Sequence, residues 1–409
     1  MKLNESKVNL SPRRVKYWEC CITKSTELIL NDSMEASIRL SGIFGYQENS
    51  KQDFILNQSF ELYKNINQKH AGYEIENFIF ETMGCSFIKD ENDNEVSLVE
   101  IHLTVPRNEE LKPKIAIANT IVYEANIIKS IKMEPNINKE RYKTLGKLLK
   151  ESRKNQADIL ILPECSVPYS MLPLLAKYSE KNGIAIIAGL EHWNVKGYCY
   201  NFIVTILPFN INGINDALVL YRLKNHYSPG EKNLIEKYGY KVPLCKPFRY
   251  DLFKWNGIYF TSFYCFELAD STHRSLFKSK VDLVIASEWN RDIPYFSNIV
   301  EALSRDIHCY VAQVNTSQYG DSRVTKPTES ILKDIIRLKG GKNDTVIVDE
   351  IDITSLRNFQ TIVTSGSNKD FKPLPPNWNF ENVKRRIKGQ WLLPKSISTP
   401  KDDIKTIFQ

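Results

Sequence analysis

Residues 114–122 read KIAIANTIV and residues 157–164 read ADILILPE, two short apolar runs that flank a long polar stretch. The intervening residues 138–156 place their apolar side chains three and four positions apart, as in an amphipathic helix. The pattern then repeats, with a helix predicted over 173–183 and a strand over 184–191. Regular alternation of strand and helix predicts an α/β sheet that is covered by helices.

The same alternation continues toward the C-terminal third of the chain. Further apolar runs that predict strands are 200–209, 216–224, 257–267, 282–289, 309–317 and 345–353. Helical spacing recurs at 271–281 and 295–308. We therefore expect one α/β domain over residues 113–355.

The two flanking regions have a different character. Residues 1–112 predict a small α+β appendage of unknown role, with a helix over 53–69 and a hairpin that starts from a strand over 76–88. The second hairpin strand alternates apolar and polar residues around Glu100 and His102, which predicts a half-buried strand. Residues 356–409 combine a proline-rich segment with a basic cluster and predict an extended tail. The cluster consists of Lys384, Arg385, Arg386 and Lys388 beside Trp391.

Composition limits the classes of function. The chain has 409 residues, 42% of them hydrophobic, and a net charge of +7, which is modest and does not by itself indicate nucleic-acid binding. Direct binding of nucleic acid stays an alternative only through the basic cluster. No leader-like segment and no apolar run of membrane-spanning length occurs, so we expect a cytoplasmic protein without a membrane partner. The eight cysteines lack paired C-x-x-C spacing, which argues against a structural zinc site or a disulfide framework.

Three chemically useful side chains each follow a predicted strand: Glu164, Lys224 and Cys265. Side chains at strand ends of an α/β sheet point into the crevice where ligands bind. A thiol is mostly protonated at neutral pH, but a nearby ammonium favours the thiolate and a carboxylate can accept the proton. A nucleophile, a cation and a proton acceptor are the parts that acyl transfer requires. Taken singly, each residue is more typical of a solvated loop or of the core.

The ordered set of motifs resembles the nitrilase, or carbon–nitrogen hydrolase, superfamily, whose catalytic residues are Glu, Lys and Cys in this chain order. The matching segments are LILPECSVP at 160–168, YRLKNHYSPGE at 221–231 and FYCFELAD at 263–270. Further similarity lies in YN at 200–201, in RDIHCYVAQVNTSQYG and GDSRVTKP at 305–327, and in DEIDI at 349–353. One departure is Glu267, where the family commonly has Asp.

The resemblance implies a four-layer α-β-β-α sandwich and a set of residue roles. Glu164 would be the general base, Lys224 the cation of the oxyanion site, Cys265 the nucleophile, and Glu231 a second glutamate that orients Lys224 or the substrate. The backbone N–H of Phe266 would assist Lys224. Substrate-binding residues are expected near the mouth of the site: His192, Tyr227, Phe266, Glu288, Trp289 and Asn290. No metal or organic cofactor is needed for this chemistry, and a homodimer or larger homo-oligomer is expected.

The expected function is therefore hydrolysis of a non-peptide C–N bond in a small amide, carbamoyl compound or nitrile through a cysteine thioester. Two alternatives stay open. The chain can be a nitrilase-like module that binds a ligand or supports a partner in a larger assembly, such as a bacterial defence system. It can also be an acyltransferase that hands the same acyl group to an amine or alcohol. His226, in the segment after Lys224, is expected to be a hydrogen-bond partner within its loop.

Overall fold

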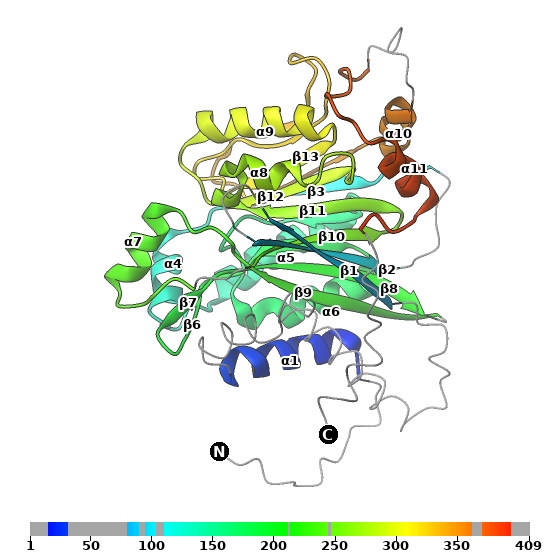
Figure 1. The fold of residues 1–409 in the computed structure, drawn as a ribbon. Helices are drawn as coiled ribbons and strands as arrows, with labels where there is room; N and C mark the ends of the chain where they lie inside the picture. Colours follow the sequence, from blue (N-terminus) through cyan, green and yellow to red (C-terminus); the bar gives the residue numbers. More distant parts are fainter. Residues whose placement is uncertain are drawn as a thin grey trace.

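Two β-sheets stacked face to face form the centre of the protein, and helices cover their outer faces (Figure 1). The computed structural model describes residues 15–31, 80–89, 95–103, 110–211, 213–243, 247–361 and 370–393. The helix predicted over 53–69 lies outside these residues. Within the described part of the chain, no helix is both long and apolar enough to cross a bilayer.

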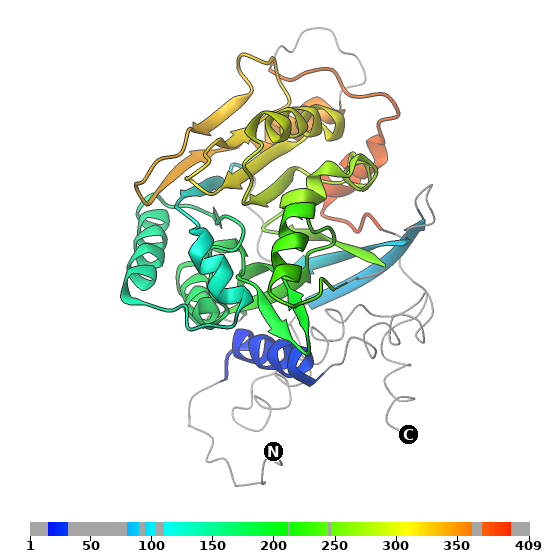
Figure 2. The same cartoon turned by 90° about the vertical axis from the view of Figure 1, so that its left-hand side faces the viewer.

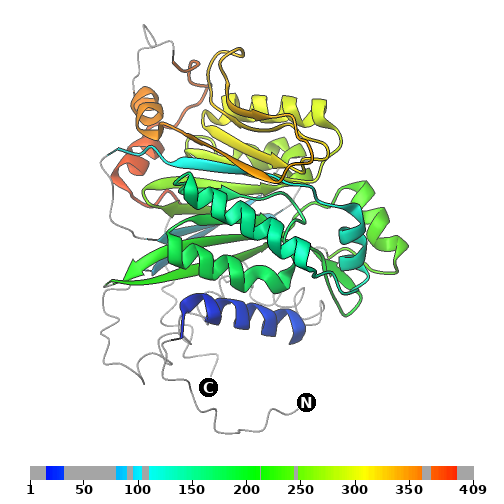
Figure 3. The ribbon, with the colours of Figure 1, turned by 180° about the vertical axis from the view of Figure 1, so that it is seen from behind.

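The first sheet has six strands in the order β16-β3-β4-β5-β8-β9. Its strands are β3 (Lys114–Asn119), β4 (Ile159–Ile161), β5 (Ala185–Gly189), β8 (Phe202–Ile211), β9 (Ile214–Leu223) and β16 (Thr345–Glu350). β3, β4 and β5 run parallel, while β8, β9 and β16 are added antiparallel. Figure 3 shows α5 (Lys139–Lys154) and α6 (Leu172–Asn182) side by side over this sheet. Asn138 caps α5 and Gly183, in the left-handed conformation, ends α6.

The second sheet has eight strands in the order β1-β2-β10-β11-β12-β13-β14-β15. Its strands are β1 (Phe80–Lys89), β2 (Glu95–Leu103), β10 (Phe248–Trp255), β11 (Ile258–Tyr264), β12 (Leu283–Glu288), β13 (Tyr310–Asn315), β14 (Ser322–Thr325) and β15 (Asp334–Leu338). α9 (Ile293–Ile307) and the short α8 (Ser271–Ser275) pack on its outer face. The order of layers is thus helix, sheet, sheet, helix, as expected from the sequence.

The remaining elements are short and lie at the edges of the sandwich. They are α1 (Tyr17–Asn31), α4 (Glu124–Ile131), η2 (Tyr169–Met171), β6 (Trp193–Val195), β7 (Tyr198–Tyr200), α7 (Pro229–Lys237), η3 (Cys265–Ala269), α10 (Ile353–Thr361) and α11 (Phe380–Lys388). The largest apolar core lies between the two sheets and extends beneath α1, α5 and α6. A second core lies between the eight-stranded sheet and α9.

The predicted hairpin forms, but it is not part of a separate appendage. β1 and β2 pair antiparallel, and β2 continues the eight-stranded sheet by running parallel to β10 (Figure 2). The prediction that β2 is half-buried is wrong, because Glu100 is 0% and His102 is 2% exposed. The Glu100 carboxylate accepts hydrogen bonds from the backbone N–H groups of Leu392 and Leu393, and the His102 ring stacks on Trp391. The C-terminal segment therefore covers the outward face of β2.

The prediction of an extended tail is also wrong for residues 380–393, which contain α11 and pack against the domain. Arg386 is buried, and its guanidinium pairs with the buried carboxylate of Asp282, which also binds Arg357 of α10. Two residues of the expected basic cluster thus make internal contacts, Arg386 in this ion pair and Trp391 on β2. The solvent-exposed basic patch inferred from the sequence shrinks accordingly.

Candidate active site

The ends of three strands bring the expected catalytic residues together. Glu164 follows β4, Lys224 follows β9, and Cys265 follows β11 as the first residue of η3. The strands approach closely at Gly189 of β5, where a Cβ atom would lie 2.5 Å from both the Glu164 Cα and the Tyr264 hydroxyl. Only glycine fits there, so the close packing of the strand ends depends on a missing side chain.

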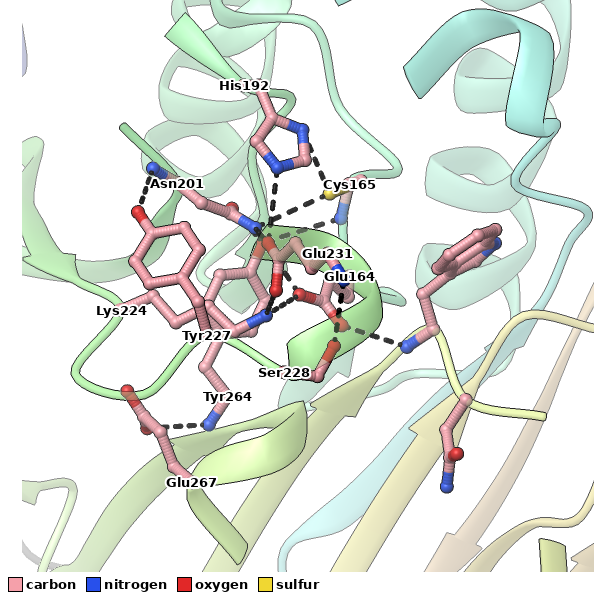
Figure 4. A network of polar contacts seen from close by, with 12 residues as sticks. Glu164, Cys165, His192, Asn201, Lys224, Tyr227, Ser228, Glu231, Tyr264 and Glu267 are labelled. Carbon is pink, nitrogen blue, oxygen red and sulfur yellow. Dashed lines mark hydrogen bonds and ion pairs between the residues drawn. The ribbon is translucent and has the colours of Figure 1, made fainter. Parts of the chain in front are cut away.

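Lys224 lies between two carboxylates, as Figure 4 shows. Its Nζ donates to Glu164 Oε1 at 2.6 Å and to Glu231 Oε2. The ammonium is 1% exposed and also lies 5.2 Å from the ring centre of Tyr264 and 5.4 Å from that of Tyr227. Two acids and two electron-rich ring faces hold the cation in one place.

Two further side chains, Asn201 and His192, contact the second glutamate. Asn201 Nδ2 donates to Glu231 Oε1 at 2.9 Å and to Glu164 Oε1 at 3.3 Å, so it bridges the two acids. His192 Nε2 lies 3.1 Å from Glu231 Oε1, and its Nδ1 lies 3.8 Å from the sulfur of Cys165. Glu231 is therefore oriented from three directions, which fits the positioning role that the resemblance implies.

Cys265 sits at a sharp turn held by a buried carboxylate. Its φ of +49° is a left-handed conformation that a non-glycine residue adopts only at a cost of about 1–3 kcal/mol. Glu267 accepts from the backbone N–H of Tyr264 at 2.8 Å and of Asn225 at 2.6 Å, and it forms a two-point ion pair with Arg222 at 2.8 Å. This one side chain ties the turn that carries Cys265 to the strand end that carries Lys224. The glutamate in place of the family's aspartate thus has a structural role.

Electrostatics leave the thiol neutral and the ammonium charged. Burial raises the pKa of Cys265 well above its ordinary value, and the adjacent Glu164 raises it further, against the opposing effect of Lys224. Burial and the charge of Glu231 raise the pKa of Glu164, although Lys224 opposes them. Burial alone would raise the pKa of Glu231, but Lys224 and His192 outweigh it and lower the pKa to about 2. For Lys224 the two carboxylates outweigh burial and raise the pKa. A neutral thiol beside a carboxylate requires general-base removal of the proton.

Two of the expected substrate-binding residues take part in the support of the site. The Tyr227 hydroxyl accepts from the backbone N–H of Asn201 at 2.9 Å, and its ring faces Lys224. His192 contacts Glu231, as described above, and is 6% exposed. Phe266 is half-buried next to Cys265. Contact of these residues with a substrate stays a prediction.

The other three lie on β12 and the loop that follows it. The Trp289 backbone N–H donates to Glu164 Oε2 at 3.0 Å, so it orients the base. Gln313 donates to Glu288 at 2.8 Å, and burial raises the pKa of Glu288 to about 8, which leaves this acid neutral at neutral pH. The Asn290 side chain accepts from the backbone N–H of Asp292 in its own loop, and the Asn290 backbone hydrogen-bonds the side chain of Asn315 at the end of β13.

Sequence reasoning did not assign a role to Cys165, Asn201, Arg222 or Tyr264. The Tyr264 hydroxyl donates to Asn201 Oδ1 at 2.7 Å, and this hydrogen bond fixes the amide that bridges the two acids. Asn201 and Arg222 lie within segments that already carry the family resemblance, and their polar character between apolar neighbours was the available signal. Cys165, whose φ is +52°, lies next to Glu164 in the sequence, and no pattern of its own marked it there as a residue of the site.

Comparison with known proteins gives structural similarity only. No protein-family profile and no curated protein matches this sequence. A CN-hydrolase superfamily protein of Xanthomonas campestris, whose structure holds an arsenic adduct in its active site, is 12% identical, covers 69% of this chain and 99% of its own, and has a TM-score of 0.44. A branch 10 nitrilase-superfamily member of Saccharomyces cerevisiae is 15% identical, covers 64% of this chain and 97% of its own, and has a TM-score of 0.45. An amidase from Nesterenkonia sp. is 14% identical, covers 60% of this chain and 92% of its own, and has a TM-score of 0.43. The solved structures named here are thus nitrilase-superfamily proteins and an amidase.

Proposed function

We propose that this protein is a carbon–nitrogen hydrolase that cleaves a non-peptide amide, carbamoyl or nitrile C–N bond through a thioester on Cys265. The observation that carries the proposal is the position of Glu164. Its carboxylate accepts from the Lys224 ammonium at 2.6 Å, and its charge acts on the thiol of Cys265, whose pKa it raises. We therefore assign the roles of base, cation and nucleophile to Glu164, Lys224 and Cys265. The ordered motifs that resemble the nitrilase superfamily support the same chemistry.

An amide substrate would be cleaved in two stages, acylation of Cys265 and hydrolysis of the thioester. Cys265 Sγ adds to the carbonyl carbon while Glu164 accepts the thiol proton. The negative charge on the substrate oxygen is stabilised by the Lys224 ammonium and the backbone N–H of Phe266. The C–N bond then breaks, and Glu164 returns the proton to the leaving amine. Water adds to the thioester, its proton passes to Glu164, and cleavage of the C–S bond releases the acid and restores the thiol.

The neutral state of Glu288 bears on the substrate. An ionised Glu288 would suit a cationic group of the substrate, but a carboxylic acid with a pKa of about 8 carries no charge at neutral pH. A buried neutral acid can donate one hydrogen bond and accept others. If Glu288 reaches the substrate, a neutral polar group is the better match.

The test is intact-protein mass spectrometry combined with product analysis after incubation with a panel of amides, carbamoyl compounds and nitriles. We expect an acyl adduct or a released acid with at least one class, and we expect both to disappear in Cys265→Ala. Cys309→Ala is the matched control, because Cys309 is also buried but lies outside the site. Absence of adduct and product with every class, or their persistence in Cys265→Ala, would refute the proposal.

The same reactions separate hydrolysis from acyl transfer when an amine acceptor is added. Replacement of the acid product by an amide of the acceptor would identify a transferase.

That the protein forms a homodimer or larger homo-oligomer stays a prediction. Light scattering on the full chain would measure its oligomeric state.

A further inference from the structure

Three potential metal ligands converge on the far side of the turn that carries Cys265. His226 lies in the loop after β9, Asp270 caps α8, and His273 lies in the first turns of α8. The three ligand atoms lie within 4.8 Å of one another. His226 Nε2 is 3.3 Å from His273 Nδ1, Asp270 Oδ2 is 3.3 Å from His273 Nδ1, and Asp270 Oδ2 is 3.9 Å from His226 Nε2.

These separations match three corners of a coordination tetrahedron. With metal–ligand bonds of about 2.0–2.1 Å, neighbouring ligand atoms of a tetrahedral site lie about 3.3 Å apart. Two of the three edges have this length, and the third exceeds it by an amount that a side-chain rotation of His226 can close. Two imidazoles and a carboxylate are the ligand set that zinc and its neighbours in the first transition row prefer.

The surroundings orient the ligands and leave a path from solvent. Asp270 uses its other oxygen, Oδ1, to accept from the backbone N–H of His273 at 3.0 Å, so Oδ2 faces the imidazoles. The Phe248 ring packs on His226 with centroids 4.4 Å apart, and the Tyr250 hydroxyl lies 3.1 Å from His273 Nδ1. The His273 side chain is 1% exposed, whereas those of His226 and Asp270 are 25% and 30% exposed. An ion can therefore enter from the side of His226 and Asp270.

We propose that His226, Asp270 and His273 bind a divalent transition-metal ion of the zinc class, which ties the loop after Lys224 to the helix after Cys265. Binding requires that the facing nitrogen of each neutral ring is unprotonated, so that each ring carries its proton on its other nitrogen; no oxidation or reduction is involved. The ion lies outside the set of groups that cleave the C–N bond, and its role is to fix the two segments that carry Lys224 and Cys265 relative to each other.

The test measures metal binding by the full chain, independently of any substrate. Protein freed of metal by chelation is titrated with Zn²⁺ against a chromophoric chelator, and with Co²⁺ followed by its visible spectrum. We expect one saturable site per chain, a tetrahedral Co²⁺ spectrum without thiolate charge transfer, and an unfolding temperature that rises with Zn²⁺. Loss of a ligand in His226→Gln or Asp270→Asn should weaken binding by at least about tenfold, since even changing a residue that only supports a metal ligand costs about 10–100-fold.

Asp292→Asn is the matched control for Asp270→Asn. Asp292 caps α9 through Tyr295 as Asp270 caps α8, and asparagine caps a helix as well as aspartate does. The control should bind Zn²⁺ like the unchanged protein. The proposal is overturned if the unchanged protein shows no saturable site, if His226→Gln and Asp270→Asn bind as tightly as it does, or if bound Co²⁺ shows thiolate ligation.

Discussion

Glu267 is the buried carboxylate that we expect to matter most for the stability of the site, and replacing it by glutamine tests this. Oε1 accepts from Arg222 and from the backbone of Asn225, and Oε2 accepts from Arg222 and from the backbone of Tyr264. Glutamine keeps the shape, but one of its two terminal atoms becomes an NH₂ group that faces two donors. The Arg222 side chain, 2% exposed, is then left without its counter-charge.

Removing one partner of a buried ion pair typically costs about 3–5 kcal/mol, because the remaining charge stays desolvated. We therefore expect Glu267→Gln to lower the free energy of unfolding by about this amount in urea titrations with an unchanged m-value. Glu301→Gln is the matched control. Its side chain is 24% exposed and pairs with Arg305 and Lys333 near the surface, so the expected loss is below about 1 kcal/mol.

The double replacement Arg222→Met with Glu267→Gln should cost less than the sum of the two single replacements, because no unpaired charge remains buried. A Glu267→Gln cost as small as that of Glu301→Gln, or strict additivity of the double replacement, would show that the pair does not hold the turn in the way the contacts indicate.

Three further changes test other parts of the site and fold. Glu231→Gln removes a negative charge that raises the pKa of Glu164. In a pH profile of the rate at which Cys265 is alkylated, the fall in rate on the acid side should therefore move to lower pH. An unchanged position, or a shift to higher pH, contradicts this. Asp282→Asn should lower the free energy of unfolding by about 3–5 kcal/mol. The two buried arginines outweigh burial and lower the pKa of Asp282. The stability that Asp282 adds is therefore present above the ordinary carboxyl pKa of 3.8 and is lost as the pH falls through the pKa of the folded state. Urea titrations of Asp282→Asn should show a weaker loss of stability in acid than those of the unchanged protein. Gly189→Ala should cost about 1–3 kcal/mol in the same titrations, whereas Gly146→Ala, on an exposed turn of α5 with open space around it, should be neutral or stabilising.

The alternating strands, and the positions of Glu164, Lys224 and Cys265 at strand ends, could be predicted from local apolar patterns. The four layers were implied by the resemblance to the nitrilase superfamily. The burial of both faces of β2 could not be predicted in this way. In the sequence Glu100 and His102 look like solvent-facing residues. The segment that covers them comes far later in the chain: Leu392, which hydrogen-bonds Glu100, is 292 residues away.

Arg386 illustrates the same limit. In the sequence it belongs to a run of basic residues that suggests a solvated surface or a nucleic-acid contact. In the structure its guanidinium is buried against Asp282, which lies 104 residues earlier at the start of β12. Charge patterns along the chain predict which residues carry charge but not which of these charges pair across the fold.

The charge balance of the centre also decides between two ways of activating the thiol. A lone ammonium beside Cys265 would favour a resting thiolate, as the sequence suggests. In the structure Lys224 is already paired with both Glu164 and Glu231, so one positive charge faces two negative ones in a buried space. A third negative charge on sulfur would be unfavourable there until one carboxylate is protonated. In the proposed mechanism, proton transfer from Cys265 to Glu164 therefore accompanies attack on the substrate, and Lys224 becomes free to stabilise the oxyanion as Glu164 loses its charge.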